Sequence, residues 1–219
     1  MRLKYFFIIN NQTINMNRYT FIMLHSFTNK PSEMNYYKPY LNRILKGNSI
    51  KYITPQAPIR NITIYGKNYR AWYDYMSDYC TLEEVISEEH LFHQCDRIHK
   101  LINEESKSTK LENIYLLGYS QGACMALAAA MTFPHRLGGI ISLKGHIPSC
   151  IFNHASKVKQ RIFAAHGIRD NVIGYNVAKN SYDKFKYKAD INFISQPKVN
   201  HSQNTGIRTQ MCYIKDFIK

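Results

Sequence analysis

The chain has 219 residues, of which 45% are hydrophobic and 20% are charged, and its formal net charge is +14. This length suits one domain of ordinary size, and the composition is that of a folded protein, which excludes a disordered chain. No apolar run approaches the ~18 residues of a membrane span. The apolar run at residues 5–9 is too short for a typical secretory leader, so we expect a strand at residues 4–9.

The positive charge is spread along the chain, with no run of four lysines or arginines and no alternation of basic and aromatic residues. Proteins that bind single-stranded nucleic acid show such patterns. We therefore expect no nucleic-acid partner and only a weak attraction to anionic membrane surfaces. The five cysteines are scattered without a CxxC pair, which is typical of reduced thiols and predicts a cytoplasmic location.

Short apolar runs alternate with longer segments of helical period, which predicts an α/β fold with a mostly parallel central sheet and helices on both faces. With no repeat or linker, the whole chain is expected to be a single domain. Strands are expected at residues 4–9, 19–24, 49–54, 113–118, 139–143, 161–166 and 192–195, and helices at residues 32–45, 82–105, 121–133, 176–185 and 207–218. Thr81 and Glu84 form a capping box at the start of the second helix. Residues 55–79 show no period and are expected to form a long loop.

The strongest local signal is the sequence Gly-Tyr-Ser-Gln-Gly at residues 118–122. It lies between an expected strand and a helix rich in small residues, which is the context of a nucleophile elbow. There a sharp turn exposes the serine and needs small neighbours, and the positive end of the helix dipole points at the site. The pattern predicts Ser120 as a nucleophile.

A serine hydroxyl needs a base to take its proton and an acid to orient that base. In α/β-hydrolases these residues follow the serine in the order acid, then histidine. Asp170 follows an expected strand, at the edge where open α/β sheets hold their sites, whereas the other downstream acids fall on or near helices. Only His201 comes after Asp170. His166 is expected to be buried and to position the acid loop, and the remaining downstream histidines are expected on the surface or in loops: His135, His146 and His154.

Four blocks of sequence, in order, resemble the phospholipase/carboxylesterase family that contains the acyl-protein thioesterases. They are residues 21–25 (FIMLH), residues 55–60 (PQAPIR) with 71–74 (AWYD), residues 118–122, and residues 166–170 (HGIRD) followed by His201. The second block is the most specific, because other α/β-hydrolases lack it, and it disfavours a different α/β-hydrolase reaction such as dienelactone cleavage.

The resemblance implies an α/β-hydrolase that cleaves carboxylic esters or thioesters of acyl chains with Ser120, Asp170 and His201 as the catalytic triad. The implied substrates are S-acylated proteins, lysophospholipids or small carboxyl esters. No cofactor is expected. No metal is expected either, because the nearby pair His90 and His93 lacks a third ligand.

The resemblance also implies an oxyanion hole built from the backbone N–H groups of Phe27 and Gln121. His25 and Trp72 are expected to bind substrate, with the alternative that Trp72 only anchors the long loop. The family has a His-Gly-x-Gly sequence where this chain has His-Ser-Phe-Thr at residues 25–28. Glycine permits a positive φ that other residues resist. A second interpretation is therefore a non-catalytic or weakly active acyl-binding homologue with an altered oxyanion loop.

Overall fold

The computed structural model describes residues 18–77 and 82–218. Six strands form one sheet in the order β2-β1-β5-β6-β7-β8, and every neighbouring pair is parallel. Their bounds are β1 Arg18–Leu24, β2 Ser49–Ile53, β5 Ile114–Tyr119, β6 Gly139–Leu143, β7 Gln160–Gly167 and β8 Ala189–Gln196. The expected α/β-hydrolase sheet is confirmed, while the strand expected at residues 4–9 lies outside the described residues.

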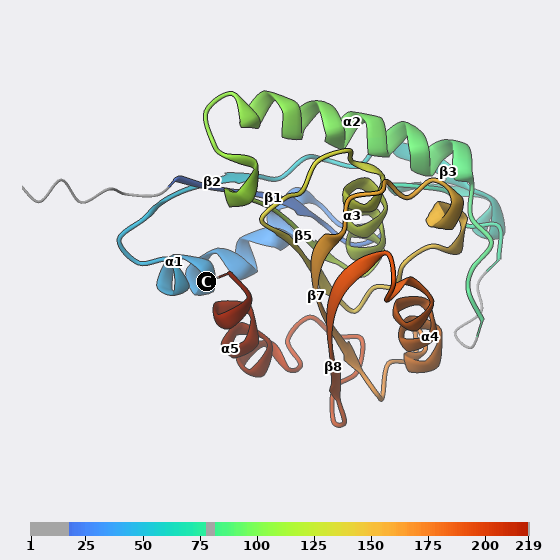
Figure 1. Cartoon of the computed structure of the whole chain (residues 1–219). Helices are drawn as coiled ribbons and strands as arrows, with labels where there is room; N and C mark the ends of the chain where they lie inside the picture. The colour runs from blue at the N-terminus through green and yellow to red at the C-terminus, as the bar shows by residue number, and fades with distance from the viewer. Residues whose placement is uncertain (1–17, 78–81, 219) are drawn as a thin grey trace, which may run out of the picture.

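Helices cover both faces of this sheet, as expected (Figure 1). One face packs against α1 (Lys38–Ile44) and α5 (Ile207–Ile218), and the other against α2 (Glu88–Ser106), α3 (Gln121–Thr132) and α4 (Tyr175–Phe185). Side chains of β1 alternate between the two cores, with Phe21 and Met23 on the first face and Ile22 and Leu24 on the second. This alternation follows from the two-residue repeat of a strand. Short 3₁₀ segments lie at η1 (Pro31–Tyr37), η2 (Thr63–Tyr65), η3 (Leu111–Asn113) and η4 (Ser149–Asn153).

The structure differs from the expected helices and loop in three places. The helix expected from residue 82 begins at Glu88, where the Ser87 side chain accepts a hydrogen bond from the backbone N–H of His90 at 3.3 Å. Ser87 therefore caps the helix, and the acidic residues of the first turn favour this start. Thr81, half of the expected capping box, lies outside the described residues, and Glu84 precedes the helix.

The helix expected at residues 32–45 is divided into η1 and α1, with a proline in the first turn of α1 that donates no backbone hydrogen bond. The loop expected at residues 55–79 contains an antiparallel hairpin, formed by β3 (Ile59–Ile62) and β4 (Lys67–Arg70). The hairpin turns through η2 and Gly66, whose φ of 58° lies in the left-handed region.

Helix α3 runs against the sheet at unusually short range, because two glycines leave no room for a side chain. A Cβ at Gly118 would lie 2.2 Å from the carbonyl oxygen of Gly122, and a Cβ at Gly122 would lie 2.1 Å from the carbonyl oxygen of Leu24. The residues of α3 from Gln121 to Met131 are all buried. The central helix, the strand before it and β1 are therefore held in one rigid unit.

Replacing Gly122 with alanine should destabilise the fold by about 3 kcal/mol or more, because backbone rather than a flexible side chain meets the new methyl group. Gly66→Ala is the matched control: it has open space around its Cβ position but a positive φ, and its expected cost is about 1 kcal/mol. Chemical denaturation of both variants measures the difference. Equal losses would contradict the close approach of α3 to β1.

Candidate active site

Ser120 occupies the turn between β5 and α3 in a backbone conformation that serine rarely adopts. Its φ is 54° and its ψ is −125°, and its N–H donates to the carbonyl oxygen of Leu143 at 3.0 Å. The glycines at 118 and 122 allow this turn, because a side chain at either would collide with neighbouring backbone. The next residue, Gln121, begins α3, so its N–H has no acceptor within the helix and lies at the positive end of the helix dipole.

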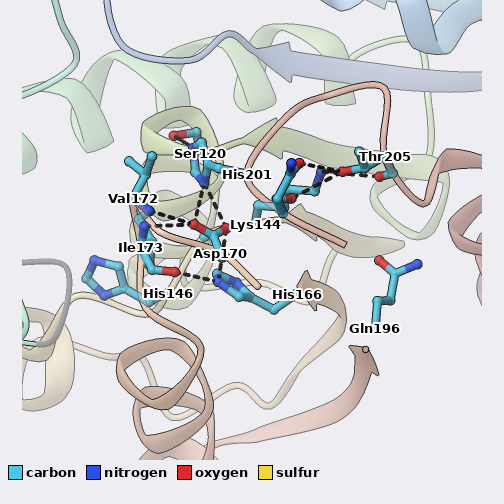
Figure 2. A network of polar contacts seen from close by, with 12 residues as sticks. Ser120, Lys144, His146, His166, Asp170, Val172, Ile173, Gln196, His201 and Thr205 are labelled. Carbon is cyan, nitrogen blue, oxygen red and sulfur yellow. Dashed lines mark hydrogen bonds and ion pairs between the residues drawn. The ribbon is translucent and has the colours of Figure 1, made fainter. Parts of the chain in front are cut away.

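The three side chains singled out in the sequence meet at the carboxyl edge of the sheet (Figure 2). The Nε2 atom of His201 lies 2.9 Å from the Oγ of Ser120, and its Nδ1 lies 2.8 Å and 3.0 Å from the two carboxylate oxygens of Asp170. The carboxylate accepts a hydrogen bond from Nδ1–H, which leaves Nε2 free to accept the proton of the serine hydroxyl. The arrangement is therefore a hydrogen-bonded line from acid to imidazole to hydroxyl.

Asp170 is almost fully buried yet held in its charged form. Burial by itself would raise its pKa, but the hydrogen bond and charge of His201, together with His166 and backbone donors, lower the pKa below its usual range. The backbone N–H groups of Val172 and Ile173 both donate to the carboxylate at 3.0 Å. A carboxylate stabilised in this way stays an acceptor when the imidazole gains a proton.

His166 supports the acid loop, as expected from its place at the end of β7. It is 1% exposed, its Nε2–H donates to the carbonyl oxygen of Ile173 at 2.8 Å, and the same nitrogen lies 3.3 Å from Asp170. Burial lowers the pKa of His166, so the ring is neutral around physiological pH. A neutral ring holds the turn after β7 without competing with His201 for charge.

The loop at residues 25–28, which is expected to contribute to an oxyanion hole, keeps one backbone donor available. The N–H of Ser26 donates to Glu33 at 2.7 Å and the N–H of Thr28 donates to the carbonyl oxygen of Arg70 at 2.8 Å. Among the hydrogen bonds of the described residues, none uses the N–H of Phe27. Its ring packs against Tyr65, Tyr69 and Tyr75, at centroid distances of 6.0, 5.6 and 5.4 Å.

Glu33 holds this loop through its side chain. Its carboxylate accepts hydrogen bonds from the N–H and Oγ of Ser26 and from the side-chain amide of Asn29, at 2.7, 2.8 and 2.6 Å. Thr28 adopts a φ of 64°, which costs a non-glycine residue about 1–2 kcal/mol. Side-chain hydrogen bonds thus enforce a conformation that glycine would take freely.

His25 and Trp72 lie beneath the site, without an exposed surface, and the substrate-binding role expected for both stays a prediction. Both side chains have 0% exposure. His25 donates through Nδ1 to the carbonyl oxygen of Ser26 at 2.8 Å and accepts from the N–H of Ala57 at 3.0 Å. Trp72 donates through its indole N–H to the carbonyl oxygen of His25 at 2.8 Å. The alternative in which Trp72 anchors the long loop matches this geometry.

The side-chain contacts of three residues near the site do not follow from the sequence pattern. The side-chain amide of Gln121 accepts from the N–H of Trp72 and donates to the carbonyl oxygen of Tyr73, each at 3.0 Å, and so joins the elbow to the AWYD segment. His146, expected at the surface or in a loop, is 3% exposed, and its Nε2 lies 2.9 Å from Glu84. Lys144 is buried directly after β6. All three depend on partners distant in sequence, which local patterns do not reveal.

Comparisons with known proteins point to one family. A family model described as phospholipase/carboxylesterase matches residues 4–219. Acyl-protein thioesterase 1 of Saccharomyces cerevisiae is 31% identical over 164 residues, covering 71% of this chain and 72% of the yeast protein. Carboxylesterase SOBER1 of Arabidopsis thaliana is 26% identical over 175 residues, covering 77% and 75% of the two chains.

Solved structures share the fold. The crystal structure of Arabidopsis thaliana SOBER1 superposes with a TM-score of 0.80 at 23% identity, over 92% of this chain and 97% of that one.

Across residues 18–77 and 82–218, no helix combines the length and apolar character that crossing a bilayer requires.

Changing Glu33 to glutamine should lower kcat/KM for a nitrophenyl ester roughly 10- to 100-fold, because hydrogen bonds to a charged acceptor are the strong ones. The carboxamide keeps a single oxygen, so its NH₂ must face a donor from Ser26 or Asn29. Glu112→Gln is the control, since that carboxylate is exposed and 3.7 Å from Lys110. Unchanged kcat/KM in Glu33→Gln would show that the loop does not depend on this carboxylate.

Proposed function

Because the chain belongs to the phospholipase/carboxylesterase family, we propose that this serine ester hydrolase cleaves acyl esters or thioesters through an acyl-enzyme formed on Ser120. The observation that carries the proposal is the continuous line of hydrogen bonds from Asp170 through His201 to the Ser120 hydroxyl. Such a line activates a hydroxyl that is otherwise a weak nucleophile.

In the first half-reaction the Oγ of Ser120 attacks the acyl carbonyl carbon while Nε2 of His201 takes the hydroxyl proton. The carbonyl π electrons move to oxygen, and the N–H groups of Phe27 and Gln121 stabilise that oxyanion. The oxygen or sulfur leaving group departs with the proton from Nε2, which leaves an ester on Ser120.

In the second half-reaction water replaces the leaving group. His201 takes a proton from the water, whose oxygen attacks the acyl carbon, and returns a proton to Ser120 as the carboxylic acid leaves. Asp170 remains ionised throughout and keeps the imidazole in the orientation that this exchange needs. No step requires a cofactor.

The substrate class follows from the named relatives, which include acyl-protein thioesterases and a carboxylesterase. We propose S-acylated proteins, lysophospholipids and small carboxyl esters as the candidate substrates of this chain. A net charge of +14 favours weak contact with anionic membranes, where acylated substrates reside. We place the protein in the cytoplasm, in keeping with its described cysteines, all of which are free thiols: Cys95, Cys124, Cys150 and Cys212.

The geometry of the oxyanion loop favours turnover over a purely acyl-binding role. Thr28 takes the left-handed conformation that glycine would supply, and Ser26 and Thr28 both have protein acceptors for their N–H groups. The loop therefore reaches a defined conformation without its glycines, and the N–H of Phe27 is left to meet an oxyanion.

A fluorophosphonate probe should label the wild-type protein at Ser120, and Ser120→Ala should abolish both labelling and hydrolysis of nitrophenyl esters. His201→Ala should slow both by several orders of magnitude, because the general base is lost. The alanine at 120 adds no atoms, so circular dichroism should be unchanged. Folded wild-type protein that neither reacts with the probe nor hydrolyses esters of any chain length would refute the proposal.

A further inference from the structure

Lys144 combines two unfavourable features directly beside the triad. It follows the last residue of β6 with a φ of 58°, in the left-handed region that lysine resists. Its residue exposure is 1%, so its charged side chain is almost wholly removed from water. Its N–H donates to the carbonyl oxygen of Ala165 at 2.9 Å, which fixes the backbone to β7. Strain and a buried charge at one residue point to a functional reason.

The ammonium of Lys144 binds the loop that carries His201 (Figure 2). Its Nζ donates to the carbonyl oxygen of Ser202, to the carbonyl oxygen of Thr205 at 3.2 Å and to the Oγ1 of Thr205 at 3.0 Å. All three acceptors are neutral, and all three lie within four residues of the catalytic imidazole in the sequence. The three N–H donors of the ammonium are thereby matched to three acceptors of one loop.

The same loop is held from a second side by Tyr119. The tyrosine hydroxyl donates to the carbonyl oxygen of His201 itself, and the Lys144 Nζ lies 6.0 Å from the centre of the Tyr119 ring. Thr205 closes the loop internally through its Oγ1, which donates to the carbonyl oxygen of Ser202 at 2.8 Å. The position of the imidazole therefore depends on contacts that converge on residues 201–205.

We propose that Lys144 is a positioning residue, whose protonated ammonium fixes the loop so that Nε2 of His201 meets the Ser120 hydroxyl. Loss of the ammonium proton then lowers the activity of the enzyme. The proposal rests on the function proposed above. Lys144 does not touch the reacting atoms; it acts through the loop backbone.

The surroundings of Lys144 lower the pH at which it loses its proton into the range that ordinary buffers cover. Burial lowers the pKa of Lys144 to about 8, and the nearby Asp170 carboxylate opposes that effect without cancelling it. The titratable groups facing the ammonium are Asp170 from the loop after β7, Tyr119 from β5, whose pKa burial raises, and His201 in the bound loop. Tyr119 stays neutral where Lys144 titrates, so the lysine is the group that changes.

Activity and stability should respond to this titration in opposite directions. Above pH ~8 the folded protein has lost the Lys144 proton while the unfolded chain keeps it up to its ordinary pKa of ~10.4. The unfolded state then binds more protons, so the contribution of this group to stability rises with pH. The activity falls over the same range because the ammonium contacts to the loop are weakened. A residue with only a structural role would not change activity and stability in opposite directions.

The test compares wild type with Lys144→Met and Lys144→Arg, with the exposed Lys159→Met as the control. Wild-type and control kcat/KM for a nitrophenyl ester should decline with a midpoint near pH 8. Lys144→Met should lose roughly 10- to 100-fold at neutral pH and show no such decline. Lys144→Arg should recover part of the activity and move the decline to higher pH, because guanidinium keeps its charge. Hydrogen exchange of residues 200–206 should accelerate in Lys144→Met.

Several results would overturn the proposal. These are full activity of Lys144→Met at neutral pH, the same alkaline decline in wild type and Lys144→Met, or unchanged hydrogen exchange in the loop. A loss of activity explained wholly by unfolding, seen as a lower melting temperature of Lys144→Met, would also reject it. Absent ester hydrolysis in all variants refutes the proposed function instead, and the loop exchange measurement then decides the role of Lys144 alone.

Discussion

The whole site depends on a steric constraint at the turn between β5 and α3. No Cβ fits at Gly118 or Gly122, because the backbone of α3 and β1 comes within 2.2 Å and 2.1 Å of the positions that such atoms would occupy. Between these two glycines Ser120 has a φ of 54°, and its hydroxyl lies 2.9 Å from Nε2 of His201. The strands β7 and β8 are parallel to β5, so the loops after them open at the same edge. The acid and the imidazole therefore reach a serine whose position is fixed by backbone contact rather than by its own preferences.

Around this turn, polar side chains hold the loops of the site through hydrogen bonds. Gln121 joins the elbow to the AWYD segment, and Trp72 joins that segment to His25. Glu33 fixes the oxyanion loop, and Lys144 fixes the histidine loop. Each of these contacts replaces water with a protein partner, so each buried group is satisfied rather than left at a cost. The chain thus reaches a defined site although Thr28, which is not a glycine, adopts a positive φ.

The fold and the three converging side chains were largely predictable from the sequence. Strand and helix periods gave the parallel sheet, and chain order after Ser120 singled out Asp170 and His201, because few acids and one histidine occupy suitable loops. The hairpin at residues 59–70 was missed because its strands are short, polar and half exposed. The start of α2 was misplaced because Ser87 competes with an equally plausible cap upstream. His146, Glu33 and Lys144 owe their roles to partners 62, 7 and 61 positions away, which a local pattern does not contain.

In the proposed mechanism, the hydrogen-bonded triad lets Ser120 carry the acyl group from the leaving group to water. The most direct measurement is rapid mixing of the protein with a chromogenic acyl ester, followed by acid quench and mass analysis of the peptide that contains residue 120. We expect a burst of leaving group close to one equivalent per protein when deacylation is the slower step, and a Ser120 peptide heavier by one acyl group. Leaving-group release without any acylated peptide, under conditions where a burst is seen, would contradict covalent catalysis at this serine.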